Sequence, residues 1–352
     1  MTGDAAAFAR LRAGLPALAA DTEVILRADG DRPLALLRPA GAPPRAFVLG
    51  GDGAAAELRP QDDGGLPAAH LFGDPRRLAD ALRTEVGAVA EPRLVAWRPG
   101  RRAVVRVRRG DELLFVKFLD RSSWQRATAT FAALADAPPP LVFARATLLL
   151  PDLCAYVAPA APGSSLRDHL AARIAPPWPL VDAALAALAR TPTAPSLPRH
   201  DFATARAAAV KMLRKAAPLA PRLDRLADRI AACTPPTPGR SGLVHGDLHD
   251  KQLFLADDTV HLIDLEGIGA GDPAFDLANL AEHLRLRALQ QTGDDDGSAD
   301  ALLDRSPTVI DRLRWRACVR ARLCGVYALR PRWAALTEQL LCEVERVLCD
   351  IE

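Results

Sequence analysis

The segment from Gly242 to Leu280 constrains this chain most, because it places two acidic turns beside short apolar runs. It reads GLVHGDLHDKQLFLADDTVHLIDLEGIGAGDPAFDLANL. The runs LFLA and VHLI have the length of short strands, and Asp257 and Asp258 between them predict a hairpin turn. Such a hairpin would bring Asp264, at the end of the second run, back beside Asp247, which precedes the first. The segment therefore predicts a site built around two carboxylates.

Phosphoryl transfer is the chemistry that such a pair of carboxylates suits, since it needs a base, oxygen ligands for a divalent cation and cations along the phosphates. Asp247 is the candidate base, Asp264 is the main candidate metal ligand, and Gln252 offers an amide oxygen to the same metal. Glu266 either binds a second metal or lines the cleft. His249 either contacts the γ-phosphate or shapes the loop through a hydrogen bond.

Three strand-like segments follow one another upstream, RLVAWR, AVVRVRR and LLFVKFL. Their connections, PGRR and GDE, are short, which predicts an antiparallel meander. The third segment carries Lys117, a candidate cation for the α- and β-phosphates. The PGRR turn holds Arg101 and Arg102, either of which could contact phosphate directly.

Helix signals flank this meander. Asp74 followed by Pro75 predicts the start of a helix that ends at Gly87. Ser122 or Ser123 is expected to cap a second helix, which ends before a triple proline. Two more strand segments, LVFARATLLL and LCAYVAP, then lead to the bend PAAPGSS, where we expect a hinge between two lobes.

The C-terminal half is mostly helical and rich in alanine. Within GDPAFDLA, Asp272 before Pro273 predicts a capped helix start, and Asp276 is expected to brace the HGD loop. The ring of His245 is expected to bond the backbone near the acidic turn IDLE.

Composition favours a folded globular protein, with 49% hydrophobic and 25% charged residues. The net charge of +2 lacks the basic excess of a nucleic-acid binder, so no nucleic-acid partner is expected. The six cysteines show no metal-ligand spacing and suit buried thiols in a reducing cytoplasm. No apolar stretch reaches the length of about 18 residues that a membrane span needs, and the first residues lack the pattern of a signal peptide. We therefore expect a cytoplasmic protein.

The motifs HGDLHDKQ, IDLE and GDPAFDLA together resemble the aminoglycoside phosphotransferase family, whose relatives include choline, homoserine and maltose kinases. The resemblance covers roughly residues 75 to 352. It implies an α+β, bilobal protein-kinase-like fold with a small antiparallel-sheet N-lobe and a mainly helical C-lobe. On this basis we expect an accessory segment of mixed strands and helix over residues 1–72, the N-lobe over 73–158 and the C-lobe over 159–352.

The resemblance also implies roles: Asp247 as catalytic base, Gln252 and Asp264 as magnesium ligands, and Lys117 as a ligand of the ATP phosphates. Three departures stand out. The turn PGRR takes the place of the family's long glycine-rich phosphate loop. Gln252 replaces the usual asparagine, and no glutamate occurs between residues 115 and 246 to pair with Lys117. Either Lys117 pairs with Gln125, Asp120 or Asp136 instead, or it is held by the nucleotide alone.

The expected cofactors are ATP and Mg²⁺, with the nucleotide at the junction of the lobes. The predicted hinge places backbone groups of the stretch from Tyr156 to Ala160 against the adenine, including those of Ala158. The acceptor is expected to be a hydroxyl of a sugar, amino alcohol or aminoglycoside-like molecule. The acidic run from Thr292 to Asp300 is either a solvated loop or a contact for the amines of a cationic acceptor.

Two other functions stay open at this point. The missing glutamate and Gln252 would also fit a catalytically weak, nucleotide-binding regulatory protein of the pseudokinase kind. Alternatively, residues 1–72 form a binding module that recruits what the kinase portion acts on. The sequence does not choose the acceptor, the nucleotide base or the oligomeric state.

Overall fold

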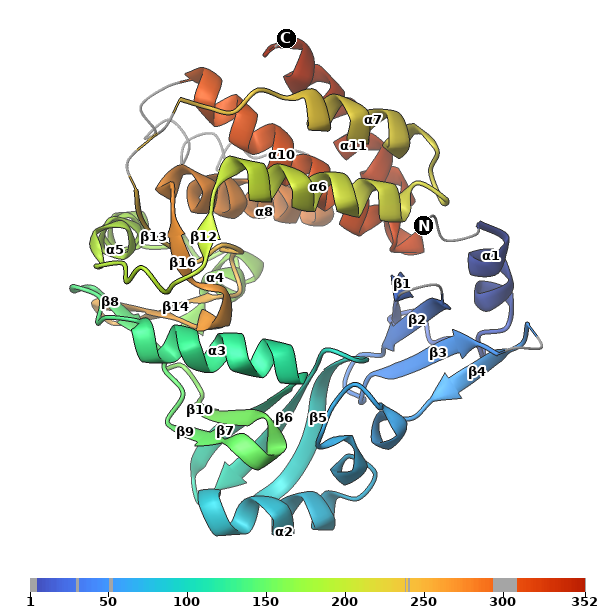
Figure 1. Ribbon diagram of the computed structural model, residues 1–352, viewed down its shortest axis with the longest axis vertical. Helices are drawn as coiled ribbons and strands as arrows, with labels where there is room; N and C mark the ends of the chain where they lie inside the picture. The colour runs from blue at the N-terminus through green and yellow to red at the C-terminus, as the bar shows by residue number, and fades with distance from the viewer. Residues whose placement is uncertain are drawn as a thin grey trace. The chain divides into compact units, whose positions relative to one another are not determined.

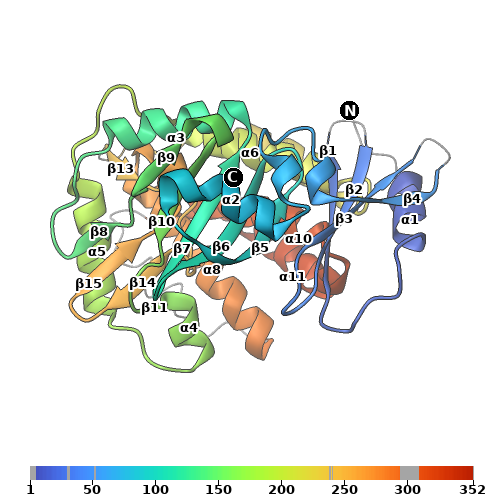
Figure 2. The same cartoon turned by 90° about the horizontal axis from the view of Figure 1, so that it is seen from below.

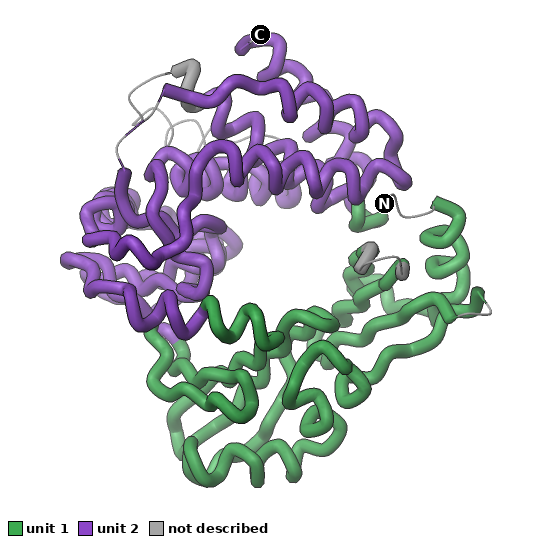
Figure 3. The backbone as a smooth tube through the Cα atoms, viewed as in Figure 1, with its two compact units in different colours: residues 1–126, 145–160, 329–332 green, residues 127–144, 161–328, 333–352 purple. Residues whose placement is uncertain are grey.

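The computed structural model describes residues 5–29, 32–50, 53–237, 239, 241–293 and 309–351. The chain folds into two compact units (Figure 3). The first unit comprises residues 1–126, 145–160 and 329–332, and the second comprises residues 127–144, 161–328 and 333–352. The expected boundary at residue 72 falls inside the first unit. The expected boundary after residue 158 falls beside the passage from the first unit to the second at residues 160–161.

The first unit begins with a helix and a four-stranded antiparallel sheet in the order β1-β2-β3-β4. The helix packs against β2 and β3. Two short 3₁₀ helices then lead to the next sheet. The bounds are α1 (Ala5–Ala13), β1 (Glu23–Asp29), β2 (Arg32–Arg38), β3 (Arg45–Leu49), β4 (Ala55–Leu58), η1 (Pro60–Asp62) and η2 (Ala69–Leu71).

A second antiparallel sheet of the first unit has five strands in the order β5-β6-β7-β10-β9, and its first three strands form the predicted meander. The strands are β5 (Ala90–Arg98), β6 (Arg102–Arg109), β7 (Glu112–Leu119), β9 (Leu148–Leu150) and β10 (Ala155–Pro159), with η3 (Pro151–Leu153) before the last. The prediction of one strand over LVFARATLLL was wrong. Its first three residues form β8 (Leu141–Phe143), which pairs with β15 (Thr259–Leu262) in a sheet of the second unit, and only its end forms β9.

Two helices flank the meander. In α2 (Pro75–Val86), the Asp74 carboxylate accepts the Arg76 N–H and Gly87 ends the helix at φ 87°, which confirms the predicted ends. Figures 1 and 2 show α2 lying over one face of the five-stranded sheet. In α3 (Arg121–Ala133), the predicted serine cap was wrong, because the carboxylate of Asp120 accepts the backbone N–H of Ser123 (3.0 Å) and so caps the helix.

One apolar core joins the N-terminal sheet to the five-stranded sheet. Buried side chains of the N-terminal sheet and of the η1–η2 region pack in the same cluster as those of α2 and of the second sheet. The members include Ile25, Leu34, Leu36, Leu66, Leu71, Leu78, Leu82, Trp97, Val105 and Val116. The segment 1–72 therefore contributes to the interior of the first unit, because burying such side chains is the main stabilising term in folding.

The second unit is mainly helical, with two small sheets in the orders β11-β14-β15-β8 and β12-β16-β13. Helix α10 packs against α6, α7, α8 and α11 (Figure 1). The helices are α4 (Leu166–Ala171), α5 (Trp178–Arg190), α6 (Phe202–Ala216), α7 (Arg222–Ala232), α8 (Pro273–Thr292), α10 (Val309–Ala328) and α11 (Ala334–Cys349), with η4 (Leu265–Gly267). The 3₁₀ helix η5 (Pro331–Trp333) lies where the chain passes from residues 329–332 of the first unit back to the second. The strands are β11 (Ser164–Ser165), β12 (Arg199–His200), β13 (Gly242–Val244), β14 (Leu253–Ala256), β15 (Thr259–Leu262) and β16 (Gly269–Gly271).

The expected α+β class, with an antiparallel-sheet part and a mainly helical part, is confirmed. Among the residues that the structure describes, no helix has the length and apolar character to cross a membrane.

Candidate active site

The HGD loop, residues 245–252, connects β13 to β14 in the second unit. Strand β13 is fully buried and packs against α5 and α8, so the loop starts from a fixed point. Gly246 has φ 83°, and a Cβ at this position would lie 2.5 Å from the ring of His200. Only glycine fits this conformation and this contact. Asp247 follows at once, with its side chain 56% exposed.

Residues on one face of α8 support this loop and the residues next to it. They recur every three or four positions, which places them on the same side of the helix. The first is Asp276, whose carboxylate accepts the backbone N–H groups of His245 (2.5 Å) and Gly246 (2.9 Å). Asp272 accepts the N–H of Ala274 (2.9 Å) and caps the helix. Both predictions from GDPAFDLA are confirmed. Burial raises the pKa of the Asp276 carboxyl, while His245 and the two N–H groups act in the opposite direction.

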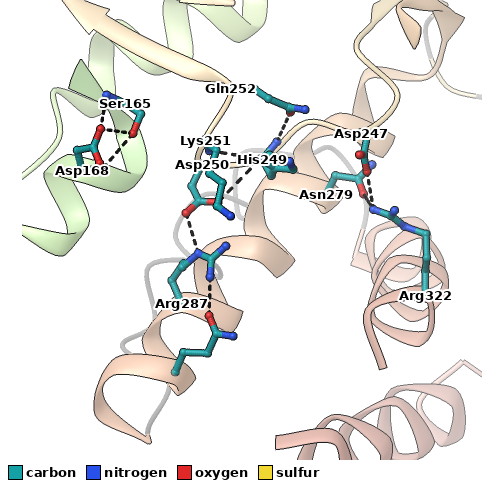
Figure 4. A network of polar contacts seen from close by, with 11 residues as sticks. Ser165, Asp168, Asp247, His249, Asp250, Lys251, Gln252, Asn279, Arg287 and Arg322 are labelled. Atoms are coloured by element: carbon teal, nitrogen blue, oxygen red, sulfur yellow. Dashed lines mark hydrogen bonds and ion pairs between the residues drawn. The ribbon is translucent and has the colours of Figure 1, made fainter. Parts of the chain in front are cut away.

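The same face of α8 continues with His283, which contacts His249, and with Arg287, which Figure 4 shows beside Asp250. The rings of His283 and His249 lie 5.0 Å apart between centroids. Burial lowers the pKa of His249 and lowers that of His283 further, so both rings are neutral at pH 7. Arg287 Nε donates to the buried Asp250 carboxylate (2.8 Å). The sequence analysis missed these supports, although their spacing from Asp276 is helical.

Gln252 ends the HGD loop with its side chain folded back onto it. The amide oxygen of Gln252 accepts the backbone N–H of His249 (3.0 Å), as Figure 4 shows. The backbone of Gln252 also accepts the N–H of Ile263 (3.1 Å), opposite it in the β14–β15 hairpin. The predicted hairpin is confirmed, and it brings Asp264 next to the end of the loop.

Asp264 follows β15 in the left-handed conformation, with φ 61° and ψ 45°. Aspartate tolerates this region better than most residues, and such backbone strain clusters at functional sites. His245 Nε2 lies 3.0 Å from the carbonyl oxygen of Ile263, so the prediction that its ring bonds the backbone here is confirmed. Glu266 lies in the following turn, η4.

Asp247 opens onto a pocket of about 210 Å³ within the second unit. Arg322, on α10, donates from Nη2 to Asp247 Oδ1 (2.8 Å) and to Asn279 Oδ1 (3.2 Å), as Figure 4 shows. Asn279 belongs to the same face of α8 as Asp276. The pocket is lined by His200, Asp201, Thr204, Ala205, Ala208, Gly246, Asp247, Phe275, Cys318, Val319 and Arg322.

Three candidate nucleotide residues lie in the first unit on two neighbouring strands, whereas His249 lies in the HGD loop of the second unit. Lys117 of β7 pairs with Tyr156 of β10, and its Nζ lies 5.9 Å from the centroid of the Tyr156 ring. Ala158 follows in the same register. The N–H of Ala160 donates to the carbonyl of Leu113 (2.9 Å), so a contact of Ala160 with adenine would have to use its carbonyl.

Arg101 lies exposed in the β5–β6 turn, the PGRR turn of the sequence. This turn is held by Asp63, a buried residue between η1 and η2. The Asp63 carboxylate accepts the N–H of Gly100 (2.9 Å), the indole N–H of Trp97 (2.8 Å) and the N–H of Gly65 (3.1 Å). No local pattern in the sequence indicated this role for Asp63, because Trp97 and Gly100 are far from it along the chain.

The chain was compared with known protein families and solved structures. A family model described as "Phosphotransferase enzyme family" matches residues 93–316, which is more than half of the chain. The chain belongs to this phosphotransferase family. The match runs from β5 into α10 and includes the HGD loop, the hairpin and α8. The family expected from the three motifs is therefore confirmed.

Solved structures similar to this phosphotransferase share little sequence with it. Choline kinase LicA from Streptococcus pneumoniae is 11% identical, with a TM-score of 0.48, covering 78% of this chain and 98% of its own. Macrolide 2'-phosphotransferase MphH from Brachybacterium faecium is 15% identical, with a TM-score of 0.45, covering 77% and 97%. Aminoglycoside phosphotransferase APH(3'')-Id from Streptomyces rimosus is 20% identical, with a TM-score of 0.44, covering 68% and 92%. No curated protein sequence matches the chain.

One of the candidate replacements for the missing glutamate partner of Lys117 is Asp120. The carboxylate of Asp120 accepts the hydroxyl of Ser122 (2.7 Å) and the hydroxyl of Ser123 (2.6 Å) besides capping α3. Asp120 is therefore engaged within its own turn. Of the acidic run from Thr292 to Asp300, residues 294–300 lie outside the described part of the chain.

Proposed function

We propose that this member of the phosphotransferase family is an ATP-dependent small-molecule kinase that transfers the γ-phosphoryl group to a hydroxyl of a sugar, amino alcohol or aminoglycoside-like acceptor. One observation carries the proposal. A loop braced by α8 presents Asp247 to a pocket of about 210 Å³, and the adjoining hairpin brings Asp264 to the end of that loop. The candidate base and the candidate metal ligand are thus brought together by one hairpin-containing segment, and phosphoryl transfer depends on such positioning.

In this proposal Asp247 accepts the proton of the acceptor hydroxyl. The acceptor oxygen attacks the γ-phosphorus, the bond from that phosphorus to the oxygen bridging to the β-phosphate breaks, and its electron pair leaves with ADP. The proton ends on the Asp247 carboxylate, which must therefore be aimed at the pocket. Arg322 holds this carboxylate at 2.8 Å, and Asn279 holds Arg322 at 3.2 Å.

The donor set fits magnesium, because Asp264, Glu266 and Gln252 offer the oxygen ligands that this cation prefers. Magnesium is usually held by one or two carboxylates together with phosphate oxygens, and when bound it would neutralise charge that develops on the phosphates. Gln252 keeps one lone pair of its amide oxygen for this purpose, since the other accepts the N–H of His249. The left-handed backbone fixes the direction of Asp264.

For the nucleotide, the proposal assigns Lys117 and Arg101 to the phosphates and backbone groups of Tyr156, Ala158 and Ala160 to the adenine. The register of β7 with β10 supports the grouping of Lys117 with Tyr156 and Ala158. His249 is buried and neutral, and its ring packs against His283. It would donate a hydrogen bond to phosphate without adding charge.

Nucleotide binding tests the proposal directly. A ligand that binds only the folded state raises the free energy of unfolding, by about 2.7 kcal/mol at 100-fold saturation. MgATP should therefore raise the Tm of the wild-type protein. Asp264→Ala should lose most of the magnesium-dependent part of that rise, whereas the matched change Asp258→Ala, in the turn of the same hairpin, should keep it. An unchanged Tm with ATP and GTP, with magnesium or manganese, would contradict the proposal.

Gln252→Asn sharpens the test of the metal site. Shortening the side chain frees the His249 N–H from its present acceptor, but restores the shorter amide usual in relatives. If Gln252 is a ligand, magnesium-dependent binding of ATP should stay the same or tighten. Loss of binding on the scale of Asp264→Ala would show that this site is built around the longer side chain. Nucleotide binding without transfer to any acceptor would instead favour a regulatory protein.

A further inference from the structure

Arg322 is the cation of the pocket that contains Asp247. It projects from α10, where Cys318 and Val319 one turn earlier are buried and also line the pocket. Its side chain is 26% exposed, so it is partly accessible to a ligand of the size of the pocket. The pairing with Asp247 sets its position, because the distance from Nη2 to Asp247 Oδ1 is 2.8 Å.

The guanidinium of Arg322 keeps donors for a ligand. Both of its contacts, to Asp247 and to Asn279, use Nη2. Within the described ranges of the chain, Nε and Nη1 of Arg322 have no hydrogen-bond partner. A guanidinium with such donors can bind a carboxylate through charge-assisted hydrogen bonds. These donors lie next to the base, so an anion bound there would stand close to the hydroxyl that Asp247 activates.

Each carboxylate that lines this pocket is engaged through one of its two oxygens. Asp201 Oδ1 caps α6 by accepting the N–H (2.8 Å) and the hydroxyl (2.7 Å) of Thr204. Asp247 is paired with Arg322. Among the described lining residues these are the two acidic side chains, and much of the remaining wall is apolar, with Ala205, Ala208, Phe275 and Val319. A polycationic acceptor needs several carboxylates around it, and the described wall offers these two, each already paired through one oxygen.

We propose, on the basis of the kinase function proposed above, that the acceptor is a small hydroxylated carboxylic acid. Its carboxylate binds the free donors of Arg322, and its hydroxyl, a few bonds away, donates to Asp247. The pocket of about 210 Å³ lies below the roughly 300–1,000 Å³ of sites for drug-sized ligands, which suits a compact acid. Among hydroxyl acceptors, this favours hydroxy acids, sugar acids and hydroxy amino acids over uncharged sugars, amino alcohols and aminoglycosides.

Matched acceptor pairs test this inference on the wild-type protein. Each pair consists of a hydroxycarboxylic acid and its primary amide, which share the hydroxyl and differ in the charge at Arg322. The panel also contains uncharged sugars, amino alcohols and an aminoglycoside. Phosphoryl transfer from MgATP is measured by ADP release and confirmed by phosphorus NMR of the product. We expect kcat/KM to be about 10-fold to 100-fold higher for the accepted acid than for its amide, the range that charge-assisted hydrogen bonds give.

Variants assign that preference to Arg322. Arg322→Gln removes the charge and should reduce the ratio of acid to amide to near one, with the loss appearing mainly in the KM for the acid. Arg322→Lys keeps the charge without the planar fork and should give an intermediate ratio. The control is Arg214→Gln on α6, which removes an arginine paired with Asp228 on the surface and should leave the ratio at the wild-type value. Because only ratios are compared, a general loss of activity does not obscure the result.

The outcomes separate this inference from the proposed function. Transfer to uncharged or cationic acceptors but to none of the acids would overturn the inference and leave the kinase in place. Equal kcat/KM for acid and amide in the wild-type protein would do the same, even if the Arg322 variants do not fold. A ratio that survives in Arg322→Gln would remove Arg322 from acid recognition. No transfer to any compound, with no effect of MgATP on Tm, would overturn both proposals.

Discussion

Two loops in different units of this protein are held by the same kind of contact, in which a buried aspartate accepts the backbone N–H of a glycine. In the first unit, Asp63 accepts the N–H of Gly100 in the β5–β6 turn. In the second unit, Asp276 accepts the N–H of Gly246 in the HGD loop. Both glycines have positive φ, 70° and 83°. In each case a buried carboxylate fixes a bend that other residues cannot adopt without strain.

The two contacts differ in which part of the chain supplies the carboxylate. Asp276 stands on α8, which also places Asn279, His283 and Arg287 against the HGD loop or its neighbours. Asp63 comes from the N-terminal segment 1–72, well before Gly100 in the chain. The HGD loop is therefore supported by a helix within the matched residues 93–316, whereas the β5–β6 turn depends on a segment that precedes them. The N-terminal segment is in this sense part of the unit that carries the candidate nucleotide residues.

The largest effect should follow from removing the N-terminal segment 1–72. A chain that begins at Gly73 lacks Asp63 and the side chains of the first sheet that share the core with Trp97 and Val105. Exposing that core should abolish the cooperative unfolding of the first unit and the binding of MgATP. Calorimetry with and without MgATP measures both. A shortened chain with the Tm and nucleotide response of the full chain would show that this segment forms a separate module.

The next largest effect should come from Asp276→Ala. The backbone N–H groups of His245 and Gly246 would lose a buried acceptor, which costs about 1–3 kcal/mol for each unsatisfied donor. The free energy of unfolding should fall by about 3 kcal/mol and kcat should fall with it, because Asp247 is the next residue. Denaturant unfolding and steady-state kinetics measure the two. A stable variant with normal kcat would break the assignment of Asp276 as the brace of the HGD loop.

A smaller and more selective effect is expected from Asp63→Ala. The buried indole of Trp97 loses its acceptor, while the N–H groups of Gly65 and Gly100 are only part-buried and can turn to water, so the free energy of unfolding should fall by about 2 kcal/mol. The KM for ATP should rise, while the KM for the acceptor should stay constant, because the β5–β6 turn belongs to the first unit. The control Asp74→Ala removes a helix cap in the same unit and should cost about 1 kcal/mol without raising the KM for ATP. Equal rises in both variants would contradict a specific role of Asp63.

Some of these aspartate contacts could be predicted from the sequence and others could not. Asp74, Asp272 and the turn at Asp257 and Asp258 obey local rules, so their caps and hairpin could be predicted from neighbouring residues. Asp276 could be predicted because its motif belongs to a recognisable family.

Asp63 and Arg322 could not be predicted in this way. Their partners Gly100 and Asp247 lie 37 and 75 positions away, and only the packing of whole elements brings them together. The preference for a serine N-cap also led to a wrong prediction where an aspartate was available, since Asp120 rather than Ser122 or Ser123 caps α3. A carboxylate with two acceptor oxygens can take the amide and both hydroxyls at once.

The most direct test of the central claim is the turnover of Asp247→Asn. The substitution keeps the size of the side chain and an oxygen for Arg322, but removes the base, so kcat for transfer from MgATP to the accepted compound should fall about 100-fold or more. The rise in Tm with MgATP should stay at the wild-type value, because the nucleotide and metal ligands are untouched. Turnover of Asp247→Asn close to that of the wild-type protein would contradict the assignment of Asp247 as the base of a kinase.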